Sequence, residues 1–199
     1  MEADLKNRII TTAKSKFFRY GFSKISVDEL ASDLGISKKT LYQHFPSKEA
    51  LLKAVIEHHR NDIKGAVDRI FDNPDIDSIS KLRSIFKEVG FRLSQVGRPF
   101  IMDLKKHAPH IWEDIDRFRR EQILNRVKQL FEEAVNEGLA RRDVNPELVY
   151  IIYSNAVQSI LNPETISQIP FVVSEIFESL IKILMQGVLT EKARADFSA

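Results

Sequence analysis

Apolar residues recur along most of this chain every three or four positions, a spacing that places them on one face of an α-helix. Near the N-terminus they stand at Leu5, Ile9, Ala13 and Phe17, and Gly21 follows. Glycine readily takes the left-handed backbone conformation that commonly ends a helix. The pattern therefore predicts a first helix that ends at Gly21, and almost no segment of the chain alternates as a strand does.

A short helix is predicted next. Ser26 and Glu29 have the spacing of a capping box, in which each side chain satisfies a backbone N–H at the start of a helix. The apolar residues between Ser26 and Gly35 recur with helical spacing, and Gly35 is again suited to end the helix. We therefore expect a helix that begins after Ser26 and stops at Gly35.

A second short helix follows almost at once. Ser37 can cap its start, and Pro46 stops it, because a proline disfavours the helical conformation of the residue before it. Two short helices joined by about three residues that include a glycine have the spacing of a helix-turn-helix, whose second helix enters the DNA major groove. Residues 38–45 are therefore predicted to be a recognition helix.

The side chains of this second helix divide between two faces. A helical wheel places Leu41 and Phe45 together as the buried anchor, and Lys39 and Gln43 on the opposite side. Lys39 and Gln43 are therefore expected to point at base edges. Thr40 and Tyr42 lie on the two flanks, where the phosphate strands would run. Lys38 lies at the entry of the helix and is expected to be free to reach either bases or phosphates.

Charge supports a nucleic-acid partner for this segment. Residues 34–48 contain no acidic residue, although the chain has 28 Asp and Glu. Lys38 and Lys39 stand in the first turn of a helix, where the helix dipole disfavours positive charge. Ser47 can cap a further helix whose exposed N–H groups, with Lys48 beside them, suit a phosphate. A solvated loop between core helices is the alternative interpretation.

Residues 5–55 resemble the N-terminal domain of the TetR/AcrR family of bacterial transcriptional regulators. The first helix ends in the family's F-x-x-x-G-[FY] pattern, here Phe17 to Phe22. The segment after it matches a long motif at nearly every fixed position, including Ala31, Gly35, Ser37, Thr40, Tyr42, His44, Phe45, Lys48 and Leu52.

The resemblance implies nearly the same assignment of residues to bases and to phosphates as the helical wheel. In the family, the residues equivalent to Thr40, Tyr42, His44 and Lys48 commonly contact phosphates. The positions that select the operator are here Lys38, Lys39 and Gln43. The resemblance also implies a palindromic operator on double-stranded DNA, a homodimer, and repression relieved by a small molecule whose identity the sequence leaves open.

Composition and charge agree with this interpretation. The chain has 199 residues, of which 43% are apolar and 29% charged, as in ordinary globular proteins. Residues 1–48 hold nine Lys or Arg against five Asp or Glu, whereas the remainder holds 21 against 23. The excess of positive charge therefore lies at the N-terminus, where the DNA is expected to bind.

We expect a cytoplasmic protein that does not enter a membrane. The first ten residues lack the basic segment and apolar core of a signal peptide. The longest apolar run, Leu148–Tyr153, is far shorter than the roughly 20 residues that span a bilayer. The absence of cysteine excludes disulfides and thiolate chemistry and suits a reducing compartment.

Helical patterns continue to the C-terminus and predict an all-α fold of about nine helices. A fourth helix runs from Ser47 to about Phe71, and a long amphipathic helix from about Pro109 to Glu137. Further helices are expected to open at residues 75–80, near Asn145-Pro146 and near residues 168–170. We expect a helix-turn-helix domain over residues 1–46 and a regulatory domain for effector binding and dimerisation over residues 47–199.

The last two predicted helices indicate self-association. Apolar residues between Phe171 and Leu189 cover more of the helix surface than packing on one side requires, and Tyr150–Ile160 is similar. Pairing of these helices with their copies predicts a four-helix dimer interface, whereas a purely intramolecular core is the alternative. The residues expected at the interface are Ile152, Ala156, Phe177, Leu180, Ile181 and Leu184.

Aromatic and soft side chains between residues 75 and 165 are candidates for an effector pocket. Any single one of them is more often a packing residue, because aromatics at helical spacing usually fill interiors. The candidates are Phe86, Phe91, Phe100, Met102, Trp112, Phe118, Tyr150 and Tyr153.

Two other classes of function remain as alternatives. Asp103, His107 and His110 have a spacing that could hold a divalent metal in a helical enzyme, but Pro109 interrupts the helix there. Motifs of hydrolases, nucleotide-binding loops and zinc proteases do not occur, so no cofactor, no metal and no catalytic residue is expected. An architectural or nucleoid-associated protein would keep the DNA-binding helix without transcriptional control.

Overall fold

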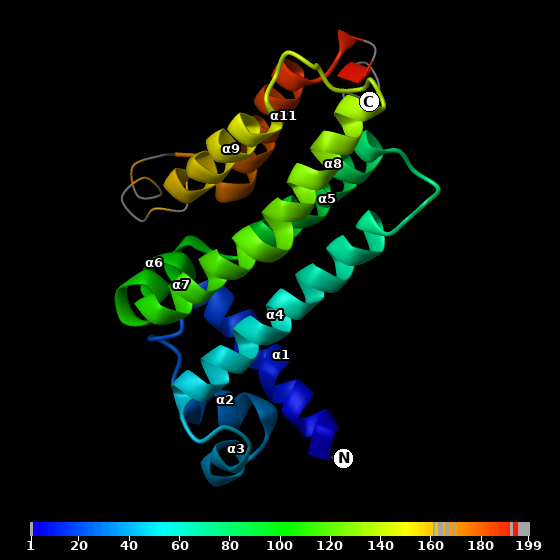
Figure 1. Cartoon of the computed structure of the whole chain (residues 1–199). Helices are drawn as coiled ribbons and strands as arrows, with labels where there is room; N and C mark the ends of the chain where they lie inside the picture. Colours follow the sequence, from blue (N-terminus) through cyan, green and yellow to red (C-terminus); the bar gives the residue numbers. More distant parts are fainter. Residues whose placement is uncertain are drawn as a thin grey trace. The chain divides into compact units, whose positions relative to one another are not determined.

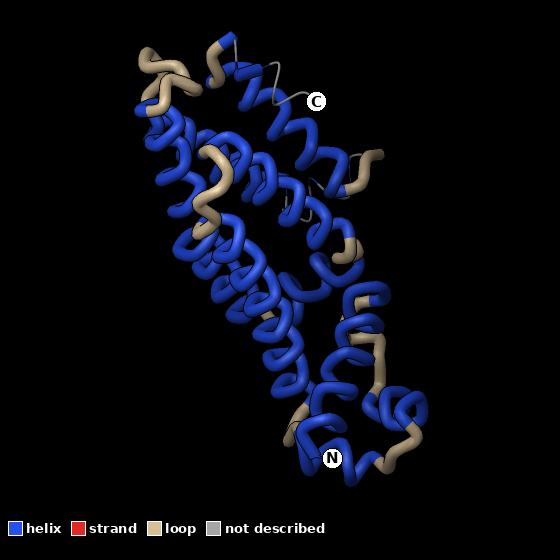
Figure 2. Tube along the Cα trace, turned by 90° about the vertical axis from the view of Figure 1, so that its right-hand side faces the viewer, coloured by secondary structure: helices blue, strands red, loops and turns tan. Residues whose placement is uncertain are grey.

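The computed structural model describes residues 2–160, 162, 165, 168, 170–191 and 193–194, and they form helices nearly throughout (Figure 1). Within this part of the chain, the one departure from helices, turns and loops is a bridged backbone pair between Ala140 and Leu189. The tube in Figure 2 accordingly shows helices joined by loops. The predicted all-α fold is confirmed.

The N-terminal helices have the bounds α1 (Glu2–Tyr20), α2 (Val27–Leu34), α3 (Lys38–His44) and α4 (Lys48–Phe71). The helices that follow are α5 (Ser78–Ser94), α6 (Arg98–His107), α7 (Pro109–Phe118), a π-helical segment η1 (Arg119–Leu124), α8 (Asn125–Asn136), α9 (Pro146–Ile160) and α11 (Val173–Val188). None of the described helices combines the length and hydropathy needed to cross a bilayer.

The start and stop signals act largely as predicted. Gly21 and Gly35 end α1 and α2 with positive φ values of 89° and 65°. Ser26 accepts the Glu29 N–H at 3.0 Å, which is half of the predicted capping box. The other half is wrong, because the Glu29 carboxylate pairs with Lys16 on α1 instead.

The long predicted helix between Pro109 and Glu137 exists but is not uniform. The helical run passes through α7, η1 and α8, and its middle turns are wider than an α-helix. The last helix begins at Val173, and part of the start predicted for it near residues 168–170 lies outside the described residues.

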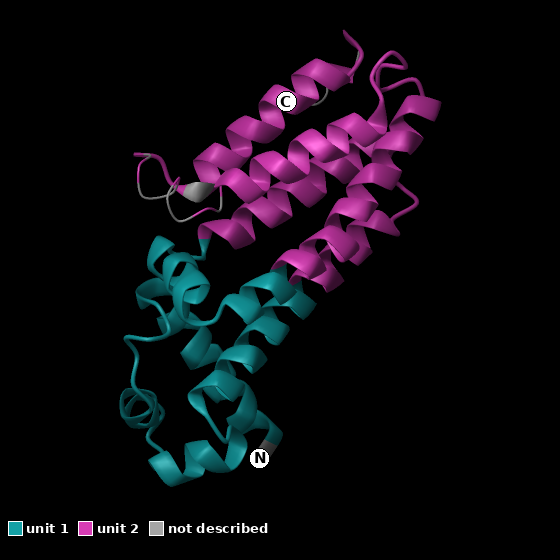
Figure 3. Cartoon of the chain, turned by 60° about the vertical axis from the view of Figure 1, so that its left-hand side comes forward, with its two compact units in different colours: residues 1–62, 95–115 teal, residues 63–94, 116–199 magenta. Residues whose placement is uncertain are grey.

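The chain forms two compact units (Figure 3). Unit 1 comprises residues 1–62 and 95–115, and unit 2 comprises residues 63–94 and 116–199. This division does not follow the predicted boundary at residues 46 and 47, because the first half of α4 and residues 95–115 pack with the N-terminal helices. The boundary between residues 46 and 47 therefore remains a prediction about function, and it does not coincide with the boundary between the two compact units.

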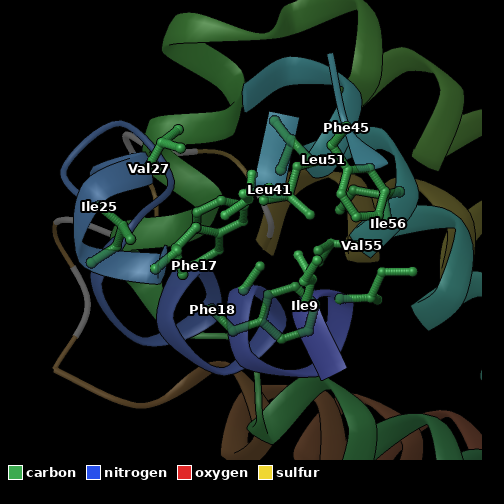
Figure 4. Packing of buried hydrophobic residues seen from close by; sticks show 14 of the residues in the cluster. Ile9, Phe17, Phe18, Ile25, Val27, Leu41, Phe45, Leu51, Val55 and Ile56 are labelled. Carbon is green, nitrogen blue, oxygen red and sulfur yellow. The ribbon is translucent and has the colours of Figure 1, made fainter. Parts of the chain in front are cut away.

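The core of unit 1 unites helices that are distant in sequence. Side chains from α1, α3 and α4 turn toward one another in Figure 4, among them Ile9, Phe17, Leu41, Phe45 and Leu51. Phe100 and Leu104 of α6 are buried in the same cluster, and Phe100 lies 4.8 Å from the ring of Phe18. In unit 2, α5 packs against α8 and α11, and α9 packs against the same two helices.

A backbone contact holds the start of α6 against the end of α1. Gly97 caps α6, and its N–H donates to the Phe18 carbonyl oxygen at 2.9 Å. A Cβ atom on Gly97 would lie only 2.6 Å from that oxygen, closer than real side chains come to backbone. Glycine is therefore required at this position.

We predict that Gly97→Ala destabilises the protein by about 1–3 kcal/mol, because the backbone of α6 must move away from α1. Gly65→Ala is the matched control, since its nearest new neighbour is the flexible end of Arg69 at 3.8 Å. That control is expected to stabilise α4 by about 0.5–1 kcal/mol. Thermal unfolding of the two variants measures the difference, and equal melting temperatures would contradict the close contact at Gly97.

Candidate nucleic-acid interface

The orientation of α3 follows from its two anchors. Leu41 is fully buried and Phe45 is 3% exposed, both within the core of unit 1. Lys39 and Gln43, on the opposite side of the helix, are exposed. The structure thus presents to solvent the two side chains that the wheel assigns to base edges.

Ser37 starts α3 as predicted. Its hydroxyl oxygen accepts the Thr40 N–H at 3.0 Å, and the two hydroxyl oxygens lie 2.8 Å apart. Thr40 is half-buried and is therefore partly engaged by the cap. Ser47 caps α4 in the same way, accepting the Ala50 N–H at 3.0 Å.

Lys38 is engaged by the protein itself. Its ammonium donates to the Asp28 carboxylate of α2 at 2.8 Å, and this hydrogen bond raises the pKa of Lys38. The expectation that Lys38 is free to reach either bases or phosphates is therefore wrong for this structure. Asp28 therefore neutralises the charge of Lys38 and draws its ammonium toward α2, and no local pattern in the sequence indicates this pair across the turn.

The remaining predicted phosphate contacts differ in exposure. Tyr42 is 39% exposed, whereas His44 is half-buried. Lys48 is also half-buried, and burial lowers the pKa of its ammonium. It donates to the Ser23 carbonyl oxygen at 3.0 Å and lies 5.7 Å from the centre of the Phe22 ring. An ammonium has three donors, so a phosphate can still bind beside the Ser23 contact.

Asp103 of α6 completes this region, and the sequence analysis missed its role. Its carboxylate accepts the Ser23 N–H at 2.7 Å and also the Ser23 hydroxyl. The negative charge of Asp103 partly offsets the lowered pKa of Lys48. Since 80 residues separate Asp103 from Ser23, no local pattern could reveal the contact.

The same contacts account for the residues of the predicted metal alternative. The Asp103 carboxylate accepts hydrogen bonds from Ser23, and His107 Nε2 lies 3.7 Å from Asp103 Oδ1. His110 Nε2 lies 3.1 Å from a carboxylate oxygen of Glu49. Across the described residues, no three His, Asp or Glu side chains gather in a way that could hold a metal ion.

The structure distributes the predicted effector residues over both units. Phe100 is buried in the core of unit 1 and Trp112 packs against it, so these two serve packing there. Met102, in the same unit, is 42% exposed. The other candidates belong to unit 2, where Phe118 is 9% exposed and the cavity linings include Phe86, Phe91, Tyr150 and Tyr153.

The predicted dimer residues are also divided. Phe177 and Ile181 are buried inside unit 2 at 3% and 6% exposure, so their assignment to a surface is wrong. Ile152 is 55% exposed, and Ala156, Leu180 and Leu184 are half-buried. Exposed apolar residues that were not predicted lie on or beside the same two helices: Leu148, Ile151, Phe171, Val172 and Ile183.

Similarity to known proteins agrees with the geometry of α2 and α3. Residues 9–55 match the model of the family described as bacterial regulatory proteins, tetR family. YvaF of Bacillus subtilis (strain 168), an uncharacterized HTH-type transcriptional regulator, is 25% identical over 194 residues, which cover 94% of this chain and 97% of that protein.

Two further proteins are similar in part or in fold. The nucleoid occlusion factor SlmA of Vibrio cholerae is 31% identical over 113 residues, and the match covers 56% of this chain and 53% of SlmA. Among solved structures, SmeT, the repressor of the Stenotrophomonas maltophilia multidrug efflux pump SmeDEF, superimposes with a TM-score of 0.69 at 14% identity and covers 94% of this chain and 92% of SmeT. This structural likeness concerns the fold alone.

The matched region contains α2, α3 and the start of α4, which present Lys39 and Gln43 at the surface. With their helix-turn-helix, residues 9–55 of this all-helical chain form a domain of the tetR family of bacterial regulatory proteins.

Proposed function

We propose that this DNA-binding regulator is a homodimeric repressor that binds a palindromic operator through α3 and leaves it when a small molecule binds. One observation carries the proposal. The side chains of Lys39 and Gln43 are exposed on a short helix whose other face, Leu41 and Phe45, is fixed in a core. A rigidly held polar face is what base readout requires.

The surrounding residues are assigned to the phosphates. Tyr42 is exposed on the flank of α3, and Lys48 lies at the start of α4. Contacts of this kind fix the register of a protein on DNA without reading sequence. Thr40 and His44, both half-buried, are assigned the same role.

A dimer is proposed because one short helix reads few base pairs. Two copies of α3 would read two half-sites about 34 Å apart, or a multiple of that distance. The exposed apolar side chains of α9 and α11, which include Ile152 and Ile183 at 55% and 71% exposure, support pairing of these helices across a two-fold axis. This surface replaces the predicted one at Phe177 and Ile181.

The control of DNA binding is proposed to pass through α4. This helix begins beside α3 and ends in unit 2, where the effector is expected to bind. A ligand can shift the protein between two arrangements only as far as it prefers one of them. The effector must therefore bind more tightly to the arrangement in which the two recognition helices cannot reach consecutive grooves.

A second candidate function is the organisation of the chromosome, which the similarity to the nucleoid occlusion factor SlmA favours. An enzymatic function is not proposed, because the family consists of regulators. Since either DNA-binding role requires the chromosome, we propose that the protein acts in the cytoplasm.

Selection of bound fragments from the source genome, followed by footprinting, tests the function. A repressor is expected to protect one or a few palindromes, whereas a chromosome-organising protein protects many sites. Failure to enrich any fragment at low salt would refute specific DNA binding by this protein.

Gln43→Ala is predicted to relax the preference for one base position, lowering the ratio of operator to random-DNA affinity by about 5- to 100-fold. Lys39→Ala is expected to act in the same way at another position. Lys48→Ala should instead weaken binding to both DNAs equally and reduce the slope of log affinity against log salt by about one. Fluorescence anisotropy measures both quantities, and equal losses on the two DNAs for Gln43→Ala would contradict its role.

Asp28→Asn is predicted to strengthen binding to operator and random DNA alike, because it releases Lys38 and removes a negative charge beside the phosphates. We expect a gain of about 3- to 10-fold and a salt slope that is steeper by about one. Asp72→Asn, which removes an exposed carboxylate at the end of α4, is the control and should change neither quantity. An unchanged salt slope for Asp28→Asn would mean that Lys38 does not reach DNA.

The double variant Ile152→Asp, Ile183→Asp is predicted to be a monomer at micromolar concentration. Burying unpaired carboxylates at the interface should weaken association by at least about 100-fold. Met102→Asp, which changes an exposed apolar residue of unit 1, should leave the dimer intact. Sedimentation velocity distinguishes the species, and a monomeric wild-type protein would refute the dimer.

A further inference from the structure

A half-open groove lies between α5 and α11 in unit 2. Its volume is about 750 Å³, within the range of about 300–1,000 Å³ that is typical of small-molecule sites. The groove is lined by residues of α5, among them Phe86, Lys87 and Phe91, and by residues of α11, among them Phe177, Ile181 and Lys182. All of these residues belong to one unit, so the groove is a feature of that unit alone.

The floor of the groove is apolar and well supported. Phe86, Gly90, Phe177 and Ile181 are all buried. The rings of Phe86 and Phe177 lie 5.9 and 6.4 Å from the ring of Tyr153, which packs behind them. A Cβ atom on Gly90 would lie in van der Waals contact with the Phe177 ring at 3.4 Å, so α5 and α11 pack directly against each other here.

The rim of the groove is mainly positive. Lys87 on α5 and Lys182 on α11 are both exposed, so cations stand on the two helices that form the walls. Arg83 also lies in the lining, and Glu178 is the one carboxylate among the described lining residues. Phe91 lies beside these charges with 61% of its surface exposed, although a large aromatic side chain favours burial.

An apolar floor beneath cations on opposite walls matches one chemical class of ligand. The apolar body of the ligand would cover Phe91 and the floor, and its anionic head would lie between Lys87 and Lys182. Hydrogen bonds between an ammonium and a carboxylate are stronger than those between neutral groups. A cationic ligand with the same apolar body would instead meet repulsion at the rim.

We propose that this groove is the effector site and that it selects an amphipathic carboxylate. The inference rests on the proposed ligand-controlled function and names the class of effector. Of the residues predicted to line an effector pocket, Phe86 and Phe91 line this groove, whereas Tyr150 lines a different cavity. That second cavity measures about 20 Å³, which is little more than the roughly 10–15 Å³ that one water molecule needs.

Calorimetric titration of the full chain with three probes that share one alkyl tail tests the selection. The probes are dodecanoate and dodecyltrimethylammonium, each below its critical micelle concentration, and dodecanol, below its solubility limit. We expect dodecanoate to bind at least about tenfold more tightly than either of the others, because its head group alone carries a negative charge that pairs with the two ammonium groups. Equal affinities, or preference for the cation, would overturn the proposal.

The double variant Lys87→Gln, Lys182→Gln locates the site. It should weaken dodecanoate binding by about tenfold or more and leave dodecanol binding unchanged. Arg69→Gln, Arg142→Gln is the matched control, since it removes two exposed positive charges of unit 2 that do not line the groove. Equal weakening of dodecanoate binding in both double variants would mean that the effect comes from the overall charge of the protein, and it would refute the site.

A parallel measurement of operator affinity separates the inference from the proposed function. Dodecanoate is expected to release a genomic operator from the wild-type protein, and less effectively from the Lys87→Gln, Lys182→Gln variant. Operator binding without any dodecanoate binding would refute the groove as an effector site and leave the DNA-binding function intact. Loss of dimerisation in the lysine variant, with no dodecanoate binding to wild type, would assign the groove to a protein contact and also refute the proposal.

Discussion

Burial of Leu41 and Phe45 is the constraint on which the recognition surface depends. A helix of seven residues is far too short to be stable alone in water, so its position comes from these two anchors. Each contributes about 1.5–3 kcal/mol of hydrophobic stabilisation, and together they fix the rotation of α3 about its axis. Lys39 and Gln43 are exposed because the opposite side of the helix is committed to the core.

That core also connects α3 to helices remote in sequence. Phe100 brings α6 against Phe18, and the Gly97 N–H and the Asp103 carboxylate tie α6 to the end of α1 and to Ser23. The Ser23 carbonyl oxygen in turn accepts a hydrogen bond from the Lys48 ammonium at the start of α4. A displacement of α6 would therefore be felt at Lys48 without passing through α3, which gives unit 1 a second connection between its core and the proposed phosphate contacts.

The local signals of the sequence predicted the elements well, because caps, glycines and prolines act within a few residues. Ser26, Ser37 and Gly35 took the positions expected of them. Contacts between residues that are distant in the chain could not be predicted in this way. Helical spacing shows that one face is buried but not against what, which is why the spacing predicts Phe177 and Ile181 at an interface and Phe100 in a pocket. The Lys38–Asp28 and Asp103–Ser23 pairs depend on the packing of whole helices, and the exposed stripe of α11 became visible only once its inner face was known.

The arrangement of faces on α11 bears on how the proposed effector would act. At about 100° per residue, Ser174, Glu178 and Lys182 fall on one side of the buried Phe177 and Ile181, and Ile176, Leu180 and Ile183 fall on the other. The first set faces the groove and the second belongs to the proposed dimer surface. A ligand wedged between α5 and α11 would press on the groove side of a helix whose far side carries the proposed dimer surface. Because packed helices shift as rigid bodies rather than deform, the ligand would change the angle between subunits, and with it the spacing of the two recognition helices, even if the ends of α4 held their positions.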